Sequence, residues 1–382
     1  MGNLKVGTPR IYPNEIAWGR DLGIDIVNQY TGNRFSSEQI HKLFSGNPTE
    51  QIRWVQESQS SHHIRVNRVD TGDIGRPNYC ACLGNNFASA KIYPRHHYRK
   101  ADNDPAGDHR GWNKGNSLIE IINANGTDID WDTSNTGHSS TYAIPDYDGF
   151  SVWEVNESAN GYYGVEAIQF NTGYDQWESF GTNYPEVKLG AIFMGRYWDA
   201  PHSAELQMVH EFQEAPVKSY KTISGRTISN SMRSAKKWGD LGAWELDDGS
   251  DLARLGLRSG RHRWKMRFRS IVDRKVLPVN AAQSKIMNLA NMDSEGEGLG
   301  YGVGDDWGFV ADEGYRFTNN ITSGDDFFSC FNKVGGNTFI FQPDNTDANP
   351  SGFFLAKFVK NSIKVTQTSS KLYDISIDIE EV

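Results

Sequence analysis

The sequence predicts a mainly β protein, in which a jelly-roll or β-sandwich module is followed by a second β-sandwich-like domain with a few short helices. Between residues 62 and 200, short segments of alternating polar and apolar residues recur, separated by turns rich in Gly, Asn and Asp. This is the pattern of a sandwich or jelly roll. Aromatic residues make up 12% of the 382 residues, and 38 residues are glycine. Aromatic side chains favour strands and glycine favours turns, so both counts support the prediction.

Three regions of the chain differ in their sequence pattern. They are residues 1–58, an N-terminal strand and helical segment expected to pack on the C-terminal domain; residues 59–200, the first β-sandwich; and residues 201–382, a C-terminal β domain with a glycine-rich acidic loop at 293–320. In the first region, Ser36 precedes Gln39 by the spacing of a capping box, which predicts the start of a helix. In the second, the predicted strands are His63–Val69, Asn78–Leu83, Ala90–Tyr93, Leu118–Ile122, Phe150–Val155, Tyr162–Phe170 and Val187–Met194.

The third region contains further β segments and two predicted helices. Val217–Ile228 alternates polar and apolar residues, with a turn predicted at Gly225. Helical spacing of apolar residues appears in Pro278–Ala290, and a short helix is predicted around Phe327 and Phe328. The remaining predicted strands are Thr338–Gln342, Phe353–Val359, Ser362–Thr366 and the C-terminal segment.

The most informative stretch is a basic strand at residues 261–271. Trp264, Met266 and Phe268 occupy alternate positions, so they share one face of a strand and are expected to be buried. The residues between them are cations, and they share the other face: Arg263, Lys265, Arg267 and Arg269. Like charges on one face repel, so this face needs carboxylates beside it.

The last residues of the chain supply such carboxylates. Residues 373–380 also alternate, with isoleucines on one face and Asp374, Asp378 and Glu380 on the other. We expect the basic and acidic strands to be neighbours in one sheet or to meet across a subunit interface. The alternative is that they are two unrelated solvated faces, since exposed ion pairs contribute little by themselves.

Net charge and cysteine usage limit the classes of partner. The net charge is −9 and the isoelectric point is about 5.6, which argues against a dedicated nucleic-acid binder. No apolar run is long enough to span a membrane. Cys80 and Cys82 share one face of a predicted strand, and Cys330 is remote. We interpret them as packed free thiols rather than zinc ligands, because four ligands at standard spacing are absent.

No motif in the chain specifies catalysis. His-Glu-x-x-His and Gly-x-Ser-x-Gly are both absent, and the 48 Asp and Glu residues are too many to single out a catalytic pair. His202, His210 and Glu211 are candidates for a metal cluster, although surface or interface histidines are favoured. We therefore predict a protein without enzymatic activity, cofactor or metal.

Two weaker binding hypotheses remain open. The loop at 102–108 is rich in carboxylates that could hold calcium, but it lacks the ordered spacing of an EF-hand, so a solvated loop is favoured. Trp131, Trp153 and Trp177 are candidates for stacking on sugar rings, but core aromatic residues are favoured.

Three strings resemble tail-associated virion proteins of tailed phages. They are the opening Leu4–Tyr12, the Leu-Gly-Asn-Asn-Phe-Ala-Ser-Ala turn at Leu83–Ala90, and the segment Leu189–Tyr197. In that family the turn follows the first strands of a discoidin-like, galactose-binding-type jelly roll, and the last segment closes it. The C-terminal half is similar in outline: a basic alternating strand, a short helix with a Phe pair, a Phe-Ile-Phe-Gln-Pro-Asp string and a final acidic strand.

This resemblance implies a structural component of the virion tail, at the tail tip, distal tail or baseplate ring, made in the host bacterial cytoplasm. The implied partners are further copies of the chain in a ring, other tail proteins and a host surface glycan, with no membrane and no catalytic residues to carry over. The basic and acidic strands are then candidate complementary surfaces. Glycan binding follows only from the fold analogy. A carbohydrate-binding adhesion module is the alternative, and a β-sandwich polysaccharide hydrolase is a weaker one.

Overall fold

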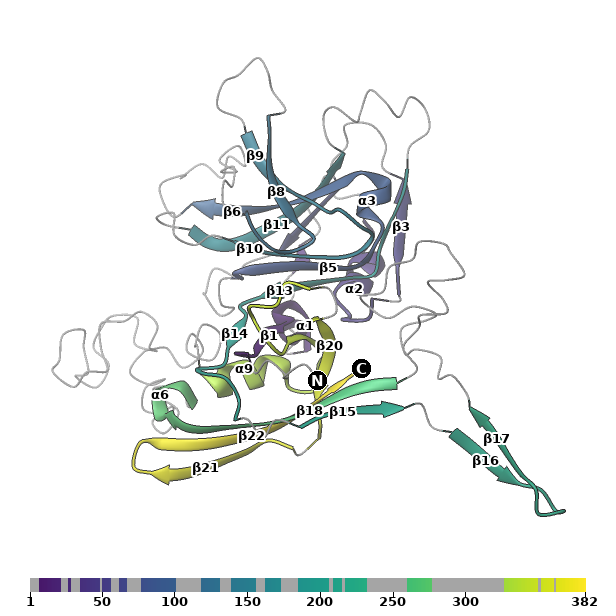
Figure 1. The fold of residues 1–382 in the computed structure, drawn as a ribbon. Coiled ribbons are helices and arrows are strands. Elements are labelled where there is room, and N and C mark those ends of the chain that lie inside the picture. Colours follow the sequence, from purple (N-terminus) through teal and green to yellow (C-terminus); the bar gives the residue numbers. More distant parts are fainter. Residues whose placement is uncertain are drawn as a thin grey trace.

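A computed structural model shows a mainly β molecule built from antiparallel sheets (Figure 1). It describes residues 7–21, 27–28, 35–48, 50–55, 62–66, 77–100, 118–130, 139–155, 162–172, 185–205, 209–214, 217–231, 260–276, 326–349, 352–360 and 362–382. In this part of the chain, none of the helices has the length and apolar character needed to cross a bilayer. The predicted fold class is confirmed at the level of a mainly β, sandwich-type architecture.

The largest sheet occupies the lower half of Figure 1 and draws strands from both ends of the chain. Its order is β14-β1-β19-β20-β22-β18-β15, with β21 paired to β22, and every pairing is antiparallel. The strands are β1 (Arg10–Pro13), β14 (Trp198–Asp199), β15 (Val209–Glu214), β18 (Gly260–Val272), β19 (Phe339–Gln342), β20 (Phe354–Phe358), β21 (Lys364–Ser369) and β22 (Leu372–Glu381).

Two four-stranded sheets face each other in the upper half. One has the order β13-β5-β10-β7, from β5 (Tyr79–Asn85), β7 (Leu118–Ile122), β10 (Gly149–Val155) and β13 (Ala191–Gly195). The other has the order β2-β4-β11-β6, from β2 (Val27–Asn28), β4 (His62–Val66), β6 (Ile92–Lys100) and β11 (Tyr162–Thr172). Three strand pairs complete the architecture: β3 (Ile52–Val55) with β12 (Glu186–Leu189), β8 (Asn125–Asp130) with β9 (Ser139–Ile144), and β16 (Val217–Lys221) with β17 (Thr227–Ser231).

Strand β5 shows why the layers stack. Cys80 and Cys82 point into a core shared with the β2-β4-β11-β6 sheet, as predicted for two thiols on one face. Tyr79, Ala81 and Leu83 point the other way, into a second core. The middle sheet is therefore buried on both faces, and its central strand is almost continuously apolar.

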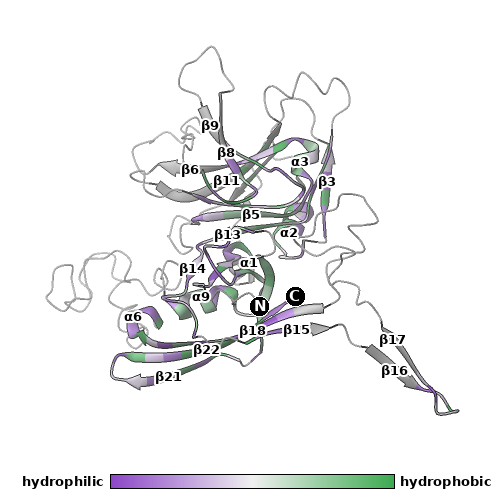
Figure 2. Ribbon diagram, viewed as in Figure 1, coloured by the Kyte–Doolittle hydropathy of each residue, from purple (hydrophilic) through white to green (hydrophobic). Residues whose placement is uncertain are grey.

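That second core joins the two halves of the molecule. It combines residues of the middle sheet with residues of the large sheet: Tyr12, Tyr79, Ala81, Leu83, Ile122, Phe150, Val152, Ala191, Phe193, Ile340, Phe353 and Leu355. We call it the central core. A third core lies on the other face of the large sheet and includes Trp264, Phe268 and Phe339. Figure 2 shows the hydrophobic segments concentrated where these layers meet.

Short helices fill the spaces between the sheets. They are α1 (Glu15–Asp21), α2 (Ser37–Leu43), α3 (Phe87–Ala90), α6 (Asp273–Val276) and α9 (Phe327–Val334). The predicted capping box of α2 is confirmed: the Ser36 hydroxyl accepts the Gln39 N–H at 3.2 Å, and the Gln39 side chain accepts the Ser36 N–H at 2.9 Å. Helix α9 is capped by Asp326, which accepts the Ser329 N–H at 2.9 Å.

Two of the predicted elements are confirmed in detail, and one predicted strand is wrong. The basic strand and its buried apolar face are confirmed as β18, and the turn at Gly225 is confirmed between β16 and β17. The single strand predicted at Val187–Met194 is wrong: it is interrupted at Gly190, because β12 pairs with β3 whereas β13 pairs with β5. The helix predicted at 278–290 and the loops at 102–108 and 293–320 lie outside the described residues.

The N-terminal segment is divided between the two halves. Strand β1 pairs with β14 and β19 inside the large sheet. Strand β3 instead pairs with β12, and α2 contacts β3 and β13, so these elements lie with the upper layers. The described parts of residues 1–58 therefore contact both halves, with β1 in the large sheet that also holds C-terminal strands.

Candidate functional site

The outer face of β18 is where the predicted charged residues meet. Strand β18 lies between β22, which carries the predicted acidic residues, and the sheet-edge strand β15. The expectation that the basic and acidic strands are neighbours in one sheet is confirmed. Their backbones pair antiparallel, with Arg263 opposite Glu380 and Lys265 opposite Asp378.

The ion pairs on this face run diagonally rather than straight across. Arg263 reaches Asp378 with an N–O distance of 2.7 Å, and Arg267 reaches Asp374 at 2.9 Å. Each cation therefore pairs with a carboxylate two positions beyond the residue directly opposite it, which long side chains can span. On the other side of β18, Lys265 pairs diagonally with Glu211 of β15 at 2.5 Å.

Two further pairs complete this face, and the sequence did not indicate them. Arg269 pairs with Glu205, which precedes β15. Glu380 pairs with Lys357 of β20 at 3.2 Å and not with a cation of β18. We call the five pairs the ion-pair ladder: Arg263–Asp378, Lys265–Glu211, Arg267–Asp374, Arg269–Glu205 and Lys357–Glu380. Glu205, Glu211 and Lys357 are distant in sequence from the basic strand, so no local spacing reveals them.

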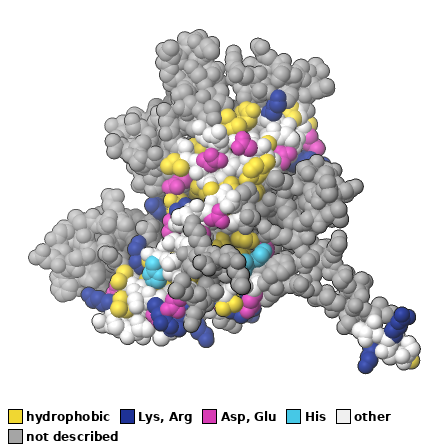
Figure 3. Space-filling view, viewed as in Figure 1, with side chains coloured by type: hydrophobic (Ala, Val, Ile, Leu, Met, Phe, Trp, Pro, Cys, Tyr) yellow, Lys and Arg dark blue, Asp and Glu magenta, His cyan; other side chains and the backbone are white. Residues whose placement is uncertain are grey.

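The ladder leaves the face charge-balanced. Each of the four cations predicted on β18 has a carboxylate of the same chain beside it, and Figure 3 shows basic and acidic side chains intermixed along the lower edge of the molecule. The side chains are partly exposed, from 11% for Asp374 to 54% for Arg269. Single exposed pairs contribute little to stability. Together, the pairs link side chains of β18 with those of β15 and β22.

Asp374 also holds an irregular point of β18. The pairing of β18 with β22 shifts between Phe268 and Ile271, and Ser270 there has a φ of 58°. The Asp374 carboxylate accepts the Ser270 N–H at 3.1 Å. Partial burial by itself raises the pKa of Asp374, but the Ser270 hydrogen bond and the Arg267 guanidinium outweigh it and hold this pKa below its ordinary value.

The candidate metal ligands His202, His210 and Glu211 each have other partners, and Glu211 pairs with Lys265. His202 contacts the carbonyl oxygens of Ser203 and Arg269, whereas His210 Nε2 lies 2.7 Å from Nδ1 of His262. The His210 ring stacks on Trp264 at a centroid distance of 5.3 Å, and desolvation lowers the pKa of His210. Within the described ranges, no three Asp, Glu, His or Cys residues are placed to share a metal ion.

Of the three tryptophans considered for glycan stacking, Trp153 is a core residue, which is the alternative that the sequence favoured. Trp153 is 0% exposed and belongs to the core between the two upper sheets, so its ring cannot stack on a sugar from solvent. The next residue along the strand, Val152, points the other way into the central core, so both faces of β10 are buried. The alternation of residues along β10 therefore could not tell whether the Trp153 side chain is exposed or buried. Trp131 and Trp177 lie outside the described residues.

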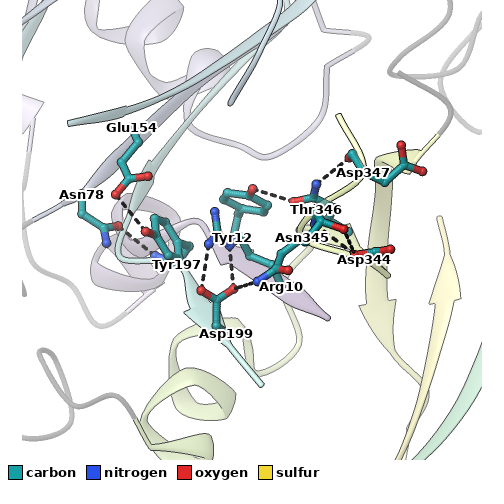
Figure 4. Close-up of polar contacts among 11 residues, drawn as sticks. Arg10, Tyr12, Asn78, Glu154, Tyr197, Asp199, Asp344, Asn345, Thr346 and Asp347 are labelled. Atoms are coloured by element: carbon teal, nitrogen blue, oxygen red, sulfur yellow. Dashed lines mark hydrogen bonds and ion pairs between the residues drawn. The ribbon is translucent and has the colours of Figure 1, made fainter. Parts of the chain in front are cut away.

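A polar cluster between the upper and lower halves was not anticipated. Arg10 binds Asp199 through two hydrogen bonds of 2.6 and 2.8 Å, and its guanidinium lies 3.9 Å from the centroid of the Tyr197 ring (Figure 4). The Tyr197 hydroxyl in turn donates to Glu154 of β10 at 2.9 Å. Asn345 reaches the same Asp199 carboxylate at 3.3 Å. The members come from four distant segments, so only the fold brings them together.

A hollow of about 440 Å³ lies beside this cluster. It is lined by Pro343, Asp344, Thr346, Asp347, Asn349 and Gly352. The Asp344 carboxylate accepts the Thr346 hydroxyl at 2.7 Å, and the Asp347 carboxylate accepts the Asn349 amide at 2.7 Å. Both carboxylates therefore shape their own loop.

The β16–β17 hairpin extends away from the body of the molecule. Two residues separate it from the end of β15, and Figures 1 and 3 show it projecting at the lower right. Ile223 lies at its turn and is fully exposed, with the exposed cations Lys221 and Arg226 nearby. The strand that leads into the hairpin is the one anchored to β18 by Lys265 and Glu211.

Comparisons with known protein families, with curated proteins and with solved structures found no match. The features that bear on function are therefore the charge-balanced face, the sheet edge at β15 and the projecting hairpin.

Proposed function

We propose that this chain is a structural component of a phage tail, at the tail tip, distal tail or baseplate ring, and that copies join through the β16–β17 hairpin. The observation that carries the proposal is the hairpin, which projects from the body with Ile223 fully exposed at its turn. A lone two-stranded hairpin is at best marginally stable in water, so a projecting one gains stability from a surface that covers it. The resemblance of the sequence to tail-associated virion proteins supports the same class.

The proposal assigns the ion-pair ladder a different role from the one first expected. Arg263, Lys265, Arg267 and Arg269 have partners within the chain, so they do not need carboxylates of a neighbouring copy. We assign them to stiffening the sheet that carries the hairpin. A hairpin that docks on a different surface of the next copy makes a head-to-tail contact, and such contacts close into a ring when the rotation between copies completes a full turn.

The test is the oligomeric state of the full chain. We expect a ring in negative-stain images and by light scattering after size exclusion. The substitution Ile223→Asp should weaken association about tenfold or more, because burying an isoleucine contributes about 1.5–3 kcal/mol and 1.4 kcal/mol is a factor of ten in affinity. Circular dichroism and the melting temperature should stay near those of the wild type, because Ile223 contacts no core.

The control is Val55→Asp, which places the same charge at another exposed apolar position, 53% exposed, on β3. It should leave the ring intact. A wild-type chain that stays monomeric at high concentration would overturn the proposal. So would an Ile223→Asp variant that assembles like the wild type.

A further inference from the structure

A fully buried ion pair joins α1 to α9. Lys333 Nζ lies 2.7 Å from Oε1 of Glu15, and the side chains are 2% and 1% exposed. The ladder pairs described above are far more open to water. The two helices contact each other in the middle of the molecule (Figure 1), although their residues are distant in the sequence.

The two carboxyl oxygens of Glu15 have different surroundings. Oε1 accepts both the Lys333 ammonium and the backbone N–H of Arg196, the latter at 3.1 Å. Oε2 is buried and has no hydrogen-bond partner among the described residues. The backbone beside Glu15 also fits closely. A Cβ at Gly195 would lie 2.7 Å from Cγ of Glu15, so only glycine leaves room for the Glu15 side chain.

Charge is costly to hold in such a site. Removing an ammonium and a carboxylate from water is costly. The two hydrogen bonds that Glu15 Oε1 accepts offset only part of that cost. Moving one proton from Lys333 to Glu15 converts the ion pair into an amine beside a carboxylic acid without changing the number of protons. Burial raises the pKa of Glu15, against the opposing influence of Lys333, which is the direction that this transfer requires.

A neutral, desolvated lysine is a nucleophile, and here it is held against a carboxyl group. In solution, amide formation is slow partly because the amine and the carboxyl group must first meet. Here the fold already holds the two groups next to each other. The Arg196 N–H is placed to stabilise negative charge on Oε1 as a tetrahedral carbon forms, as a single oxyanion donor would. The unpartnered Oε2 is the oxygen free to depart.

We propose that Lys333 and Glu15 form an intramolecular amide cross-link. The bond formed joins Lys333 Nζ to Cδ of Glu15, and the bond broken joins Cδ to Oε2. One amine proton and the carboxylic acid proton leave with Oε2 as a water molecule, and the second amine proton stays on the amide nitrogen. No oxidant, metal or cofactor is needed. The cross-link ties β1 and α1 to α9 and does not depend on the proposed tail function.

The test is the intact mass of the full chain under denaturing conditions. We expect the purified wild-type protein to be lighter than its sequence mass by one water molecule. Trypsin should then fail to cleave after Lys333, so that residues 317–357 stay continuous and are linked to the peptide Ile11–Arg20. Fragmentation of that linked peptide should place the bond between Glu15 and Lys333.

Two variants serve as controls. Lys333→Met removes the nucleophile and should restore the full sequence mass, also in protein recovered unfolded, since mass does not require a folded sample. Lys357→Met removes the lysine of the partly exposed pair with Glu380, at 35% and 28% exposure. Its intact mass should still be lower than its sequence mass by one water molecule. A wild-type chain at full sequence mass after prolonged incubation would overturn the proposal. A Lys333→Met variant whose mass is still lower by one water molecule would also overturn it. The water would then have been lost elsewhere, for example at Asp148-Gly149.

Discussion

At the residue scale, the outer face of β18 shows how charge and register depend on each other. The side chains pair diagonally because the residue directly opposite Arg267 is Ser376, which offers no charge, whereas Asp374 lies two positions beyond it. Asp378 instead pairs with Arg263. Which cation meets which carboxylate is decided by the register and the twist of the strands.

A double-mutant cycle tests this assignment. Arg267→Glu and Asp374→Lys should each destabilise the fold, and the double variant should recover a coupling of about 0.5 kcal/mol, a small value because Arg267 is partly exposed. Urea unfolding measures it. The pKa of Asp374 is lowered in the folded state, so the coupling should be present above the ordinary aspartate range and disappear as pH falls through this lowered pKa.

The same cycle with Asp378→Lys in place of Asp374→Lys is the control, and its coupling should be near zero. A larger coupling to Asp378 than to Asp374 would show that the register of β18 and β22 differs from the one described here.

At the element scale, close backbone approaches decide where strands break. Gly190 separates β12 from β13, and a Cβ at this position would lie 1.9 Å from the carbonyl oxygen of Pro48. The turn after α2 therefore packs directly on the chain between two strands. The apolar pattern of 187–194 continues through Gly190, so periodicity alone predicts one strand where the fold has two.

Gly190→Ala should destabilise the protein by roughly 3 kcal/mol, because backbone atoms on both sides must move to admit a methyl group. Gly335→Ala is the matched control: its Cβ would meet its nearest neighbour at 3.4 Å, an ordinary contact. Thermal or denaturant unfolding of the two variants gives the comparison. Equal stabilities would mean that Pro48 does not pack on Gly190.

At the scale of the whole molecule, the central core joins the upper layers to the large sheet. Phe353 is fully buried there and contacts ring partners from both halves, with Tyr12 at 6.5 Å and Phe150 at 6.4 Å between centroids. Arg10 and Asp199 add a polar link at the edge of the same junction. Layers that share a core are expected to unfold together.

The wild-type chain should therefore show one cooperative transition by calorimetry. Phe353→Ala should lower stability by about 3–5 kcal/mol and separate the unfolding of the two halves, because it opens a cavity between them. Phe328→Ala is the control, since Phe328 is partly buried beside the third core, away from the junction. A single unshifted transition in Phe353→Ala would show that the halves are not coupled through this core.

Local patterns were sufficient to predict some of the elements. The alternation of Trp264, Met266 and Phe268 with cations defines β18 and its buried face, and Ser36 with Gln39 defines the start of α2. Both depend on neighbouring residues, whose directions are set by backbone geometry. The pairing of the basic with the acidic strand was also accessible, because unbalanced charge on one face requires a partner.

The candidate site was only partly predictable. The seven charged residues on β18 and β22 lie together, but Glu205, Glu211 and Lys357, which complete the ladder, come from segments with no distinctive pattern. Trp153 lies in the core, as favoured from the sequence, but period two could not decide the question because both faces of β10 are buried.

The sequence by itself determined that this is a mainly β protein, where its main strands lie and which face of β18 is buried. These properties follow from side-chain period, which is local. Only the tertiary structure decided that the layers share a central core, that Arg267 meets Asp374, and that Lys333 is buried against Glu15. Those contacts join residues far apart in the chain, and they exist because packing the sheets brings the segments together.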